Sequence, residues 1–166
     1  MFREMRRKKQ NLPERECSIV LERGTSGVLA LYGEEGYPYA VPLSYIYDGD
    51  KKKIYFHCAK AGHKLDAIKR NEKASFCVID QDEIIPEEFT TYFRSVIAFG
   101  KIRIMKEPEE MRAAIEKLAV KYAPEESADS REKEIERDWK TLCMLEMTID
   151  HLTGKEAIEL VRKKSQ

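Results

Sequence analysis

The fold of this chain is decided by the stretch Ile54-Tyr55-Phe56-His57-Cys58-Ala59-Lys60-Ala61-Gly62-His63-Lys64-Leu65-Asp66-Ala67-Ile68. An apolar run typical of a β-strand stops at small and basic residues, and apolar residues then return at helical spacing. The stretch therefore predicts a strand, a tight turn and the start of a helix. The first backbone N–H groups of a helix have no partner within it, and the helix dipole places partial positive charge there.

This predicted turn has the chemistry of a phosphate-binding site. Ala61, Gly62, His63 and Lys64 would offer unpaired N–H groups, and Gly62 lets the backbone approach an anion closely. Lys60 and Lys64 add full charges, while His63 can donate a hydrogen bond or take up a proton near neutral pH. The same residues are also common at solvated helix starts, so the turn alone leaves both interpretations open.

The composition limits the possible classes of protein. With 166 residues, 42% hydrophobic and 36% charged, we expect one domain over residues 1–166 with a basic N-terminal arm at residues 1–10. The formal charge is zero, which indicates neither a broad nucleic-acid-binding face nor an acidic tail. No run reaches the length of a membrane span, and no signal-peptide core follows the basic start. We therefore expect a cytoplasmic protein without nucleic-acid or membrane partners.

The cysteines do not indicate a metal site. None of them forms a C-x-x-C pair, so neither zinc binding nor a disulfide framework is predicted. Each falls at an apolar-patterned position, which favours buried free thiols. They are Cys17, Cys58, Cys77 and Cys143.

Most of the chain has the pattern of strands. Pro13 and Gly24 bound a short amphipathic helix predicted over residues 11–23. The sequence Asp-Gly-Asp at residues 48–50 predicts a hairpin turn. Gly100 interrupts a run of alternating apolar residues, which indicates a bulge. Periodicity predicts six strands, at residues 28–32, 37–47, 54–57, 74–80, 93–105 and 143–150.

The remaining segments are polar or helical. Residues 81–88 are acidic and are expected to form an exposed loop. Pro108 opens a helix whose apolar residues recur from position 111 to 122. Residues 125–137 are polar and fit either a solvated helix or a mobile connection. Together these elements predict an α+β fold, a six-stranded, mostly antiparallel, closed or split β-barrel with flanking helices.

The order of motifs resembles a known family. Residues 36–45 (GYPYAVPLSY), 54–59 (IYFHCA) and 62–68 (GHKLDAI) are similar to the FMN-binding split-barrel proteins related to pyridoxamine 5′-phosphate oxidase. Residues 92–100 (YFRSVIAFG) and 152–157 (LTGKEA) look like the nitroimidazole-resistance, or Nim-type, branch of that family. The resemblance covers nearly the whole chain.

This resemblance implies a homodimer with one FMN per subunit at the interface. In such proteins the strand matching residues 42–45 lies along the flavin ring, and the turn matching residues 57–64 holds the ribityl phosphate, with Lys64 as the first expected contact. Arg94 and Ser95 are expected to reach the flavin from the partner subunit, although a strand arginine is also a common surface cation. The implied FMN-binding residues are Pro42, Leu43, Ser44, Tyr45, His57, Cys58, Ala59, Gly62, His63, Lys64, Arg94, Ser95 and Trp139.

Two of these residues keep alternative roles. His63 is the candidate acid or substrate anchor, and it also fits a role in phosphate binding alone. Trp139 is the only tryptophan, and an aromatic residue in a polar stretch marks either an interface or the cap of a core. No metal-binding residue is predicted.

The implied activity is an FMN-dependent oxidoreductase that reduces a small aromatic or nitroaromatic, 5-nitroimidazole-like compound. No Gly-x-Gly-x-x-Gly fingerprint is present, so an NAD(P)H donor would bind transiently over the flavin. Residues that bind pyridoxal phosphate in the oxidases proper have no counterpart, which argues against vitamin B6 oxidation. The alternatives are a non-catalytic flavin- or haem-binding protein in storage or sensing, and a dimer with an empty pocket, because fold alone does not fix the reaction.

Overall fold

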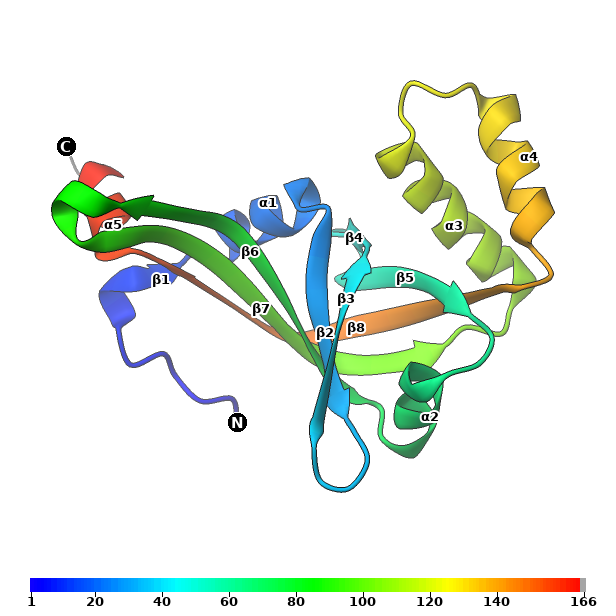
Figure 1. The fold of residues 1–166 in the computed structure, drawn as a ribbon, viewed down its shortest axis with the longest axis horizontal. Helices are drawn as coiled ribbons and strands as arrows, with labels where there is room; N and C mark the ends of the chain where they lie inside the picture. Colours follow the sequence, from blue (N-terminus) through cyan, green and yellow to red (C-terminus); the bar gives the residue numbers. More distant parts are fainter. Residues whose placement is uncertain (165–166) are drawn as a thin grey trace.

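The computed structural model describes residues 1–164 and shows one curled antiparallel sheet with helices around it (Figure 1). The strands are β1 (Asn11–Leu12), β2 (Ser26–Tyr32), β3 (Pro38–Ser44), β4 (Ile46–Asp48), β5 (Lys53–Ala59), β6 (Lys73–Ile85), β7 (Thr90–Ile104) and β8 (Leu142–Glu156). The α-helices are α1 (Glu14–Arg23), α2 (His63–Arg70), α3 (Pro108–Tyr122), α4 (Ala128–Asp138) and α5 (Ile158–Lys164). Short 3-10 turns lie at Lys8–Gln10 and Pro86–Glu88.

The sheet curls into a barrel that stays split along one line. Its strand order is β3-β2-β6-β7-β8-β5-β4, and β1 pairs with β8. β4 pairs only with residues 53–55 of β5, so among residues 1–164 no strand pairs with the other edge of residues 56–59. That free edge of β5 approaches β3, the first strand of the order, without sharing a ladder with it. We call this line the seam between β3 and β5.

The α+β split-barrel prediction is therefore confirmed, with eight strands in residues 1–164 rather than six. The alternating side chains of the sheet fill the interior, where Phe76 packs edge-on against Tyr45 and Phe56 with ring centroids 4.9 and 5.0 Å apart. Helix α1 covers this core with Cys17, Val20 and Leu21, as its spacing predicts. The interior supplies apolar burial on one face of every long strand, which stabilises the barrel.

A second apolar cluster lies on the outer face of β5 and β8, beneath α3. Tyr55 and Met144 are buried there against Ala114 and Leu118 of the helix. Residues 54–58 of β5 therefore alternate between the barrel interior and this outer cluster. His57 lies on the same face of β5 as Tyr55, because residues two apart on a strand share a face. Its side chain consequently points outward, toward α3 and α4.

The single strand predicted over residues 37–47 is wrong, because the chain breaks at Tyr45. Residues before it pair with β2, and residues after it pair with β5. The Tyr45 side chain is fully buried, and its hydroxyl donates to the Leu21 carbonyl at 2.8 Å. This anchor holds the chain where it crosses from one end of the sheet order to the other.

The exposed loop predicted over residues 81–88 is also wrong for most of its length. Residues 81–85 continue β6 and pair with residues 90–94 of β7, so only Pro86–Glu88 turns. The hairpin extends well away from the barrel (Figure 1). The acids misled the prediction because residues 82–84 of β6 are exposed and residues 81 and 85 are only half-buried, so this part of the strand lacks the apolar alternation of a half-buried strand.

Other boundaries differ less. The first helix begins at Glu14, with Pro13 as its N-cap rather than inside it, and the last strand runs to Glu156 rather than to residue 150. Of the two alternatives for residues 125–137, the helix is the one observed, because most of this segment forms α4. The bulge at Gly100 is confirmed by a register shift after Phe99, where a Cβ would collide with the Thr148 carbonyl. Helix α5 has no counterpart in the prediction.

All four cysteines are free thiols, although only Cys17 and Cys143 are buried while Cys58 and Cys77 are half-buried. None of the helices in residues 1–164 is both long enough and apolar enough to span a bilayer.

Candidate functional site

The turn between β5 and α2 has the geometry expected of an anion site. Gly62 is the N-cap residue of α2, with φ 132° and ψ 169°, and no side chain caps the helix. Its carbonyl accepts the N–H groups of Leu65 and Asp66 at 3.0 and 3.2 Å. Space exists for a Cβ at this position, so the positive φ rather than crowding is what favours glycine. The first N–H groups of the helix remain available to a ligand.

Two lysines at this turn lack a protein partner. Within residues 1–164, neither Lys60 nor Lys64 forms an ion pair or a side-chain hydrogen bond. By contrast, Lys69 on the same helix lies 3.7 Å from the Asp66 carboxylate. Burial raises the pKa of the Cys58 thiol to about 12, and the positive charge of Lys64 opposes that rise, so the ammonium lies near the end of β5. The turn thus carries positive charge that no carboxylate of the described residues neutralises.

His63 closes the seam on the side of α2. Its imidazole stacks on the ring of Tyr39 in β3, with centroids 4.0 Å apart and planes 28° from parallel. The contact fixes the histidine ring at the first position of the helix. It also joins β3 to the turn across the line where the two sheet edges share no ladder.

Strand β3 presents alternate residues to solvent. Pro42 and Ser44 are exposed, whereas Leu43 packs against the barrel core. Within residues 1–164 the strand pairs only with β2, so its outer edge keeps backbone N–H and C=O groups that no described strand uses. Proline is tolerated at position 42 because such an edge strand has no second ladder to which its missing N–H would donate.

Tyr45 contributes its backbone rather than its ring to this region. Burial raises the pKa of its hydroxyl, and the ring lies in the core. The Tyr45 N–H donates to the Tyr122 hydroxyl at 2.9 Å, and that hydroxyl is also 3.0 Å from the Tyr45 carbonyl oxygen and in contact with the Thr25 carbonyl. Tyr122 therefore fastens the end of α3 to the point where β3 gives way to β4.

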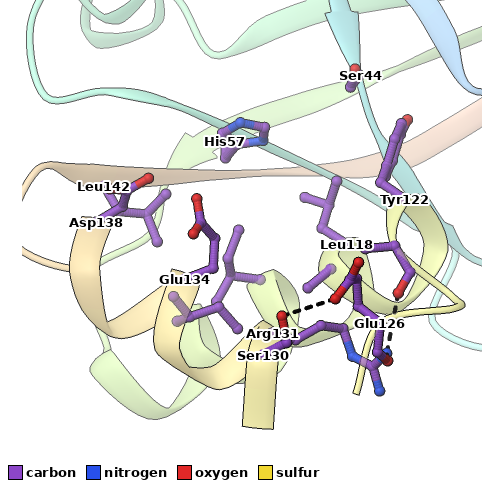
Figure 2. Close-up of a pocket in the computed structure, with 14 residues that line it drawn as sticks. Ser44, His57, Leu118, Tyr122, Glu126, Ser130, Arg131, Glu134, Asp138 and Leu142 are labelled. Atoms are coloured by element: carbon purple, nitrogen blue, oxygen red, sulfur yellow. Dashed lines mark hydrogen bonds between the residues drawn. The ribbon is translucent and has the colours of Figure 1, made fainter. Parts of the chain in front are cut away.

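A pocket of about 590 Å³ opens beside the seam, between the sheet and the α3–α4 hairpin (Figure 2). Ser44, His57 and Leu142 come from three strands and form the sheet side of it. In Figure 2, Glu134 of α4 projects into the space facing His57. The helical side combines apolar and charged residues: Ile115, Leu118, Ala119, Tyr122, Ala123, Glu126, Ser130, Arg131, Glu134, Ile135 and Asp138.

The helical wall is held together by its own ion pairs. Arg112 of α3 donates to Glu136 of α4 at 2.8 Å and also pairs with Glu132. Its guanidinium carbon lies 5.7 Å from the centre of the Trp139 ring. Trp139, at the end of α4, therefore packs against the outer apolar cluster and does not line the pocket of its own chain.

Arg94 lies elsewhere, in a cluster of ion pairs at the base of the β6–β7 hairpin. Its guanidinium, with a side chain only 18% exposed, contacts Asp80 at 3.2 Å and Glu156 at 3.1 Å. Burial by itself raises the pKa of the Asp80 carboxyl, but hydrogen bonds from Arg23 and Arg94 outweigh it and lower the pKa overall. Neither Arg94 nor Ser95 lines the pocket in its own chain.

Comparison with known proteins now identifies the family. Residues 13–156 match the sequence profile of pyridoxamine 5′-phosphate oxidase. The chain belongs to the pyridoxamine 5′-phosphate oxidase family. A comparison with curated proteins finds no match.

Solved structures share the fold of this family member at low sequence identity. A conserved hypothetical protein from Mycobacterium tuberculosis is 17% identical with a TM-score of 0.79, covering 98% of this chain and 94% of that one. A proposed 5-nitroimidazole antibiotic resistance protein from Bacteroides thetaiotaomicron is 18% identical with a TM-score of 0.73, covering 88% and 86%. A FAD-binding protein from Mesorhizobium loti is 22% identical with a TM-score of 0.60, covering 89% and 97%.

The structure thus brings together Ser44 and His57, two of the residues singled out in the sequence of this family member. The sequence made His63 the candidate acid or substrate anchor, with phosphate binding as the alternative role, and the structure adds His57 as the histidine that lines the pocket. The sequence did contain a signal for His57. Ile54 and Phe56 are buried in the core, so the alternation of a strand places His57 on the opposite, outer face. The carboxylates of α4 had no such signal, since their segment was compatible with either a helix or a mobile connection.

Proposed function

We propose that this chain is an FMN-binding oxidoreductase that reduces a small aromatic or nitroaromatic compound. The observation that carries the proposal is that Ser44 and His57 line one pocket beside a basic turn whose lysines have no ion-pair partner among residues 1–164. Membership of the pyridoxamine 5′-phosphate oxidase family supports it, as does the FAD-binding neighbour with the same fold.

The turn fits the phosphate of FMN. No side chain caps the first N–H groups of α2, and the ammonium groups of Lys60 and Lys64 lie at the same turn. Together they would bind a phosphate dianion through charge-assisted hydrogen bonds. His63, held by Tyr39, can add a hydrogen bond from its ring. We therefore assign phosphate binding to Gly62, His63 and Lys64.

The seam suits a planar polar ring. The outer edge of β3 and the edge of residues 56–59 of β5 carry backbone groups that no strand pairs with. Pro42, Leu43 and Ser44 on one side, and residues 57–59 on the other, would place donors and acceptors along such a ring. When bound, FMN supplies the hydride or electron-pair chemistry.

The pocket suits a compact, largely apolar substrate. Its volume of about 590 Å³ lies within the range of about 300–1,000 Å³ typical of small-molecule sites. Ile115, Leu118 and Ile135 would contact the ring of the substrate. His57 is the only histidine that lines the pocket within the described chain, and histidine is the most common general acid in enzymes, so we assign it the role of proton donor and leave phosphate contact to His63.

A second copy of the chain would complete this site. Arg94 and Ser95 do not line the pocket of their own chain, so their predicted contact with the flavin requires them to come from a partner subunit. We propose a homodimer with the flavin at its interface. A mass measurement by light scattering on the flavin-loaded protein tests this, and a monomer would contradict it.

The absorption spectrum of the purified protein is the first experiment. We expect flavin bands, or their appearance as bound species after FMN is added, and anaerobic bleaching with NADH or NADPH. Parallel titration with FAD distinguishes the two flavins. Flavin that binds but stays oxidised with either donor and with photoreduction would support the non-catalytic alternative, while a Soret band or no flavin binding would contradict the proposal.

A further inference from the structure

We propose that Cys58 and Cys143 form a reversible disulfide that ties β5 to β8 at the base of the phosphate-binding turn. The two strands are antiparallel, and their register places Cys58 directly opposite Cys143. Opposed residues of such a pair have Cα atoms about 4.5–5.5 Å apart. Disulfides span Cα separations of about 4.4–6.8 Å, so the backbone already has the required spacing.

The side chains lie on the same face of the sheet. Cys143 is part of the barrel core, and Cys58 packs against that core at its margin. Both are free thiols. Burial is the largest cause that raises the pKa of Cys58 to about 12, and the charge of Cys143 and a hydrogen bond with it add to this rise. The register and the shared face of the sheet thus make the two thiols neighbours.

Their surroundings keep the pair reduced until an oxidant arrives. A protonated thiol is a poor nucleophile, so the raised pKa makes oxidation slow at neutral pH and faster in alkali. Cys58 is half-buried while Cys143 is buried, which makes Cys58 the thiol that a small oxidant meets first. A peroxide is the class of oxidant we infer.

The reaction balances in two steps. The Cys58 thiolate attacks one peroxide oxygen, the O–O bond breaks, and a sulfenic acid forms while the second oxygen leaves as water. The Cys143 thiol then loses its proton and attacks the Cys58 sulfur, so an S–S bond forms and a second water leaves. Two thiols lose two electrons in total, and the peroxide is reduced to two water molecules. A reducing thiol reverses the bond by exchange.

Oxidation would act on the turn because Cys58 lies immediately before it. Disulfide Cβ atoms lie about 3.5–4.5 Å apart, closer than the roughly 4.5–5.5 Å of an ordinary cross-strand pair. Closing the bond therefore draws the end of β5 toward β8, and the turn that carries Lys60 and Lys64 moves with it. This coupling to flavin affinity rests on the proposed function, whereas the disulfide itself does not.

The bond is tested by peptide mapping of the full chain. The protein is treated with hydrogen peroxide, denatured, alkylated, digested and examined by mass spectrometry. We expect a linked peptide pair containing Cys58 and Cys143, formed faster at alkaline than at neutral pH, with Cys17 and Cys77 still alkylated. Intact thiols, or over-oxidised Cys58 without a linked pair, would overturn the proposal.

The coupling is tested by titrating FMN into reduced and oxidised protein. We expect affinity to fall about tenfold on oxidation, as for loss of one charge-assisted contact, and to recover with a reducing thiol. The matched control is Cys77→Ser, since Cys77 faces Val28 and Ile97 rather than a thiol. It should keep the response, and Cys143→Ser should lose it.

Peptide mapping and FMN titration distinguish failure of the disulfide proposal from failure of the proposed function. Equal FMN affinity in linked and reduced protein would overturn the coupling. If the reduced chain binds no flavin, the proposed function fails while peptide mapping still decides whether the disulfide exists.

Discussion

His63 stacks on Tyr39 with ring centroids 4.0 Å apart, and this contact joins the N-terminus of α2 to an edge strand that shares no ladder with β5. The pair bridges the seam beside the turn to which we assign the flavin phosphate. A ring contact of this kind is worth about 0.5–1.5 kcal/mol beyond its burial. Its loss should therefore be measurable as weaker cofactor binding.

Replacing Tyr39 by leucine should lower FMN affinity by roughly 2- to 10-fold, because the His63 ring loses the surface that orients it. Quenching of FMN fluorescence on titration measures the dissociation constant. The control is Tyr37→Leu, since Tyr37 is 74% exposed just before the same strand. Equal affinities for the two variants would show that the stack does not orient a phosphate contact.

Lys64→Ala should weaken FMN binding by about 1.5–3 kcal/mol, the range for a charge-assisted hydrogen bond. That corresponds to roughly 10- to 150-fold in the dissociation constant. Lys69→Ala is the matched control, because Lys69 lies on the same helix but pairs with Asp66. A Lys64 variant that binds as tightly as the Lys69 variant would remove Lys64 from the site.

His57→Gln should slow substrate reduction by about 10²- to 10⁴-fold, the usual contribution of a positioned general acid, and should affect FMN affinity much less. The measurement is the rate at which photoreduced protein is reoxidised by a 5-nitroimidazole, followed across pH. His151→Gln serves as the control, because His151 stacks on Phe2 and does not line the pocket. An unchanged rate and pH profile for His57→Gln would assign the proton to another donor.

The ion cluster around Asp80 predicts a pH-dependent stability. Its side chain is 8% exposed and pairs with Arg23 and Arg94, which lower the pKa of the carboxyl. A lowered folded-state pKa stabilises the protein above the unfolded value of about 3.9, and the contribution is lost as pH falls through the folded-state pKa. Asp80→Asn should therefore cost about 1.5–3 kcal/mol of unfolding free energy at neutral pH.

Urea unfolding of the flavin-free protein measures this cost. The difference between the original chain and Asp80→Asn should narrow as the pH is lowered below about 4. Asp82→Asn, at an exposed position further along β6, should leave stability within about 0.5 kcal/mol. A difference that persists in acid would mean that packing, rather than charge, accounts for the Asp80 effect.

The sequence predicted those parts of the fold that depend on local pattern. Alternating apolar and polar residues from Cys143 to residue 150 predicted the last strand, and the interruption of such alternation at Gly100 predicted the bulge. Both predictions depend only on which face of a strand is buried. The turn at residues 59–62 was predictable for a similar reason, since apolar spacing changes from that of a strand to that of a helix.

The rest depended on contacts between distant residues. The break at Tyr45 is fixed by Leu21 and by Tyr122, neither of which is near it in sequence. Residues 81–85 form a ladder with β7, but none of their side chains is buried, so the acidic composition of this segment is the same as that of an exposed loop. The pocket forms because α3 packs on β5 and carries α4 with it, and no local pattern in the His57 segment specifies this helical wall.

The seam has a further consequence for how this protein can change over evolutionary time. The long β2–β3 and β5–β8 ladders lie on the edges of β3 and β5 away from the seam. The opposite wall of the pocket belongs to the α3–α4 hairpin, which side chains such as Arg112 and Tyr122 hold in place. Substitutions in that hairpin can therefore reshape what the pocket admits without breaking a single strand pairing. One barrel can in this way be adapted to many small molecules, because the part that discriminates among them is separate from the part that keeps the chain folded.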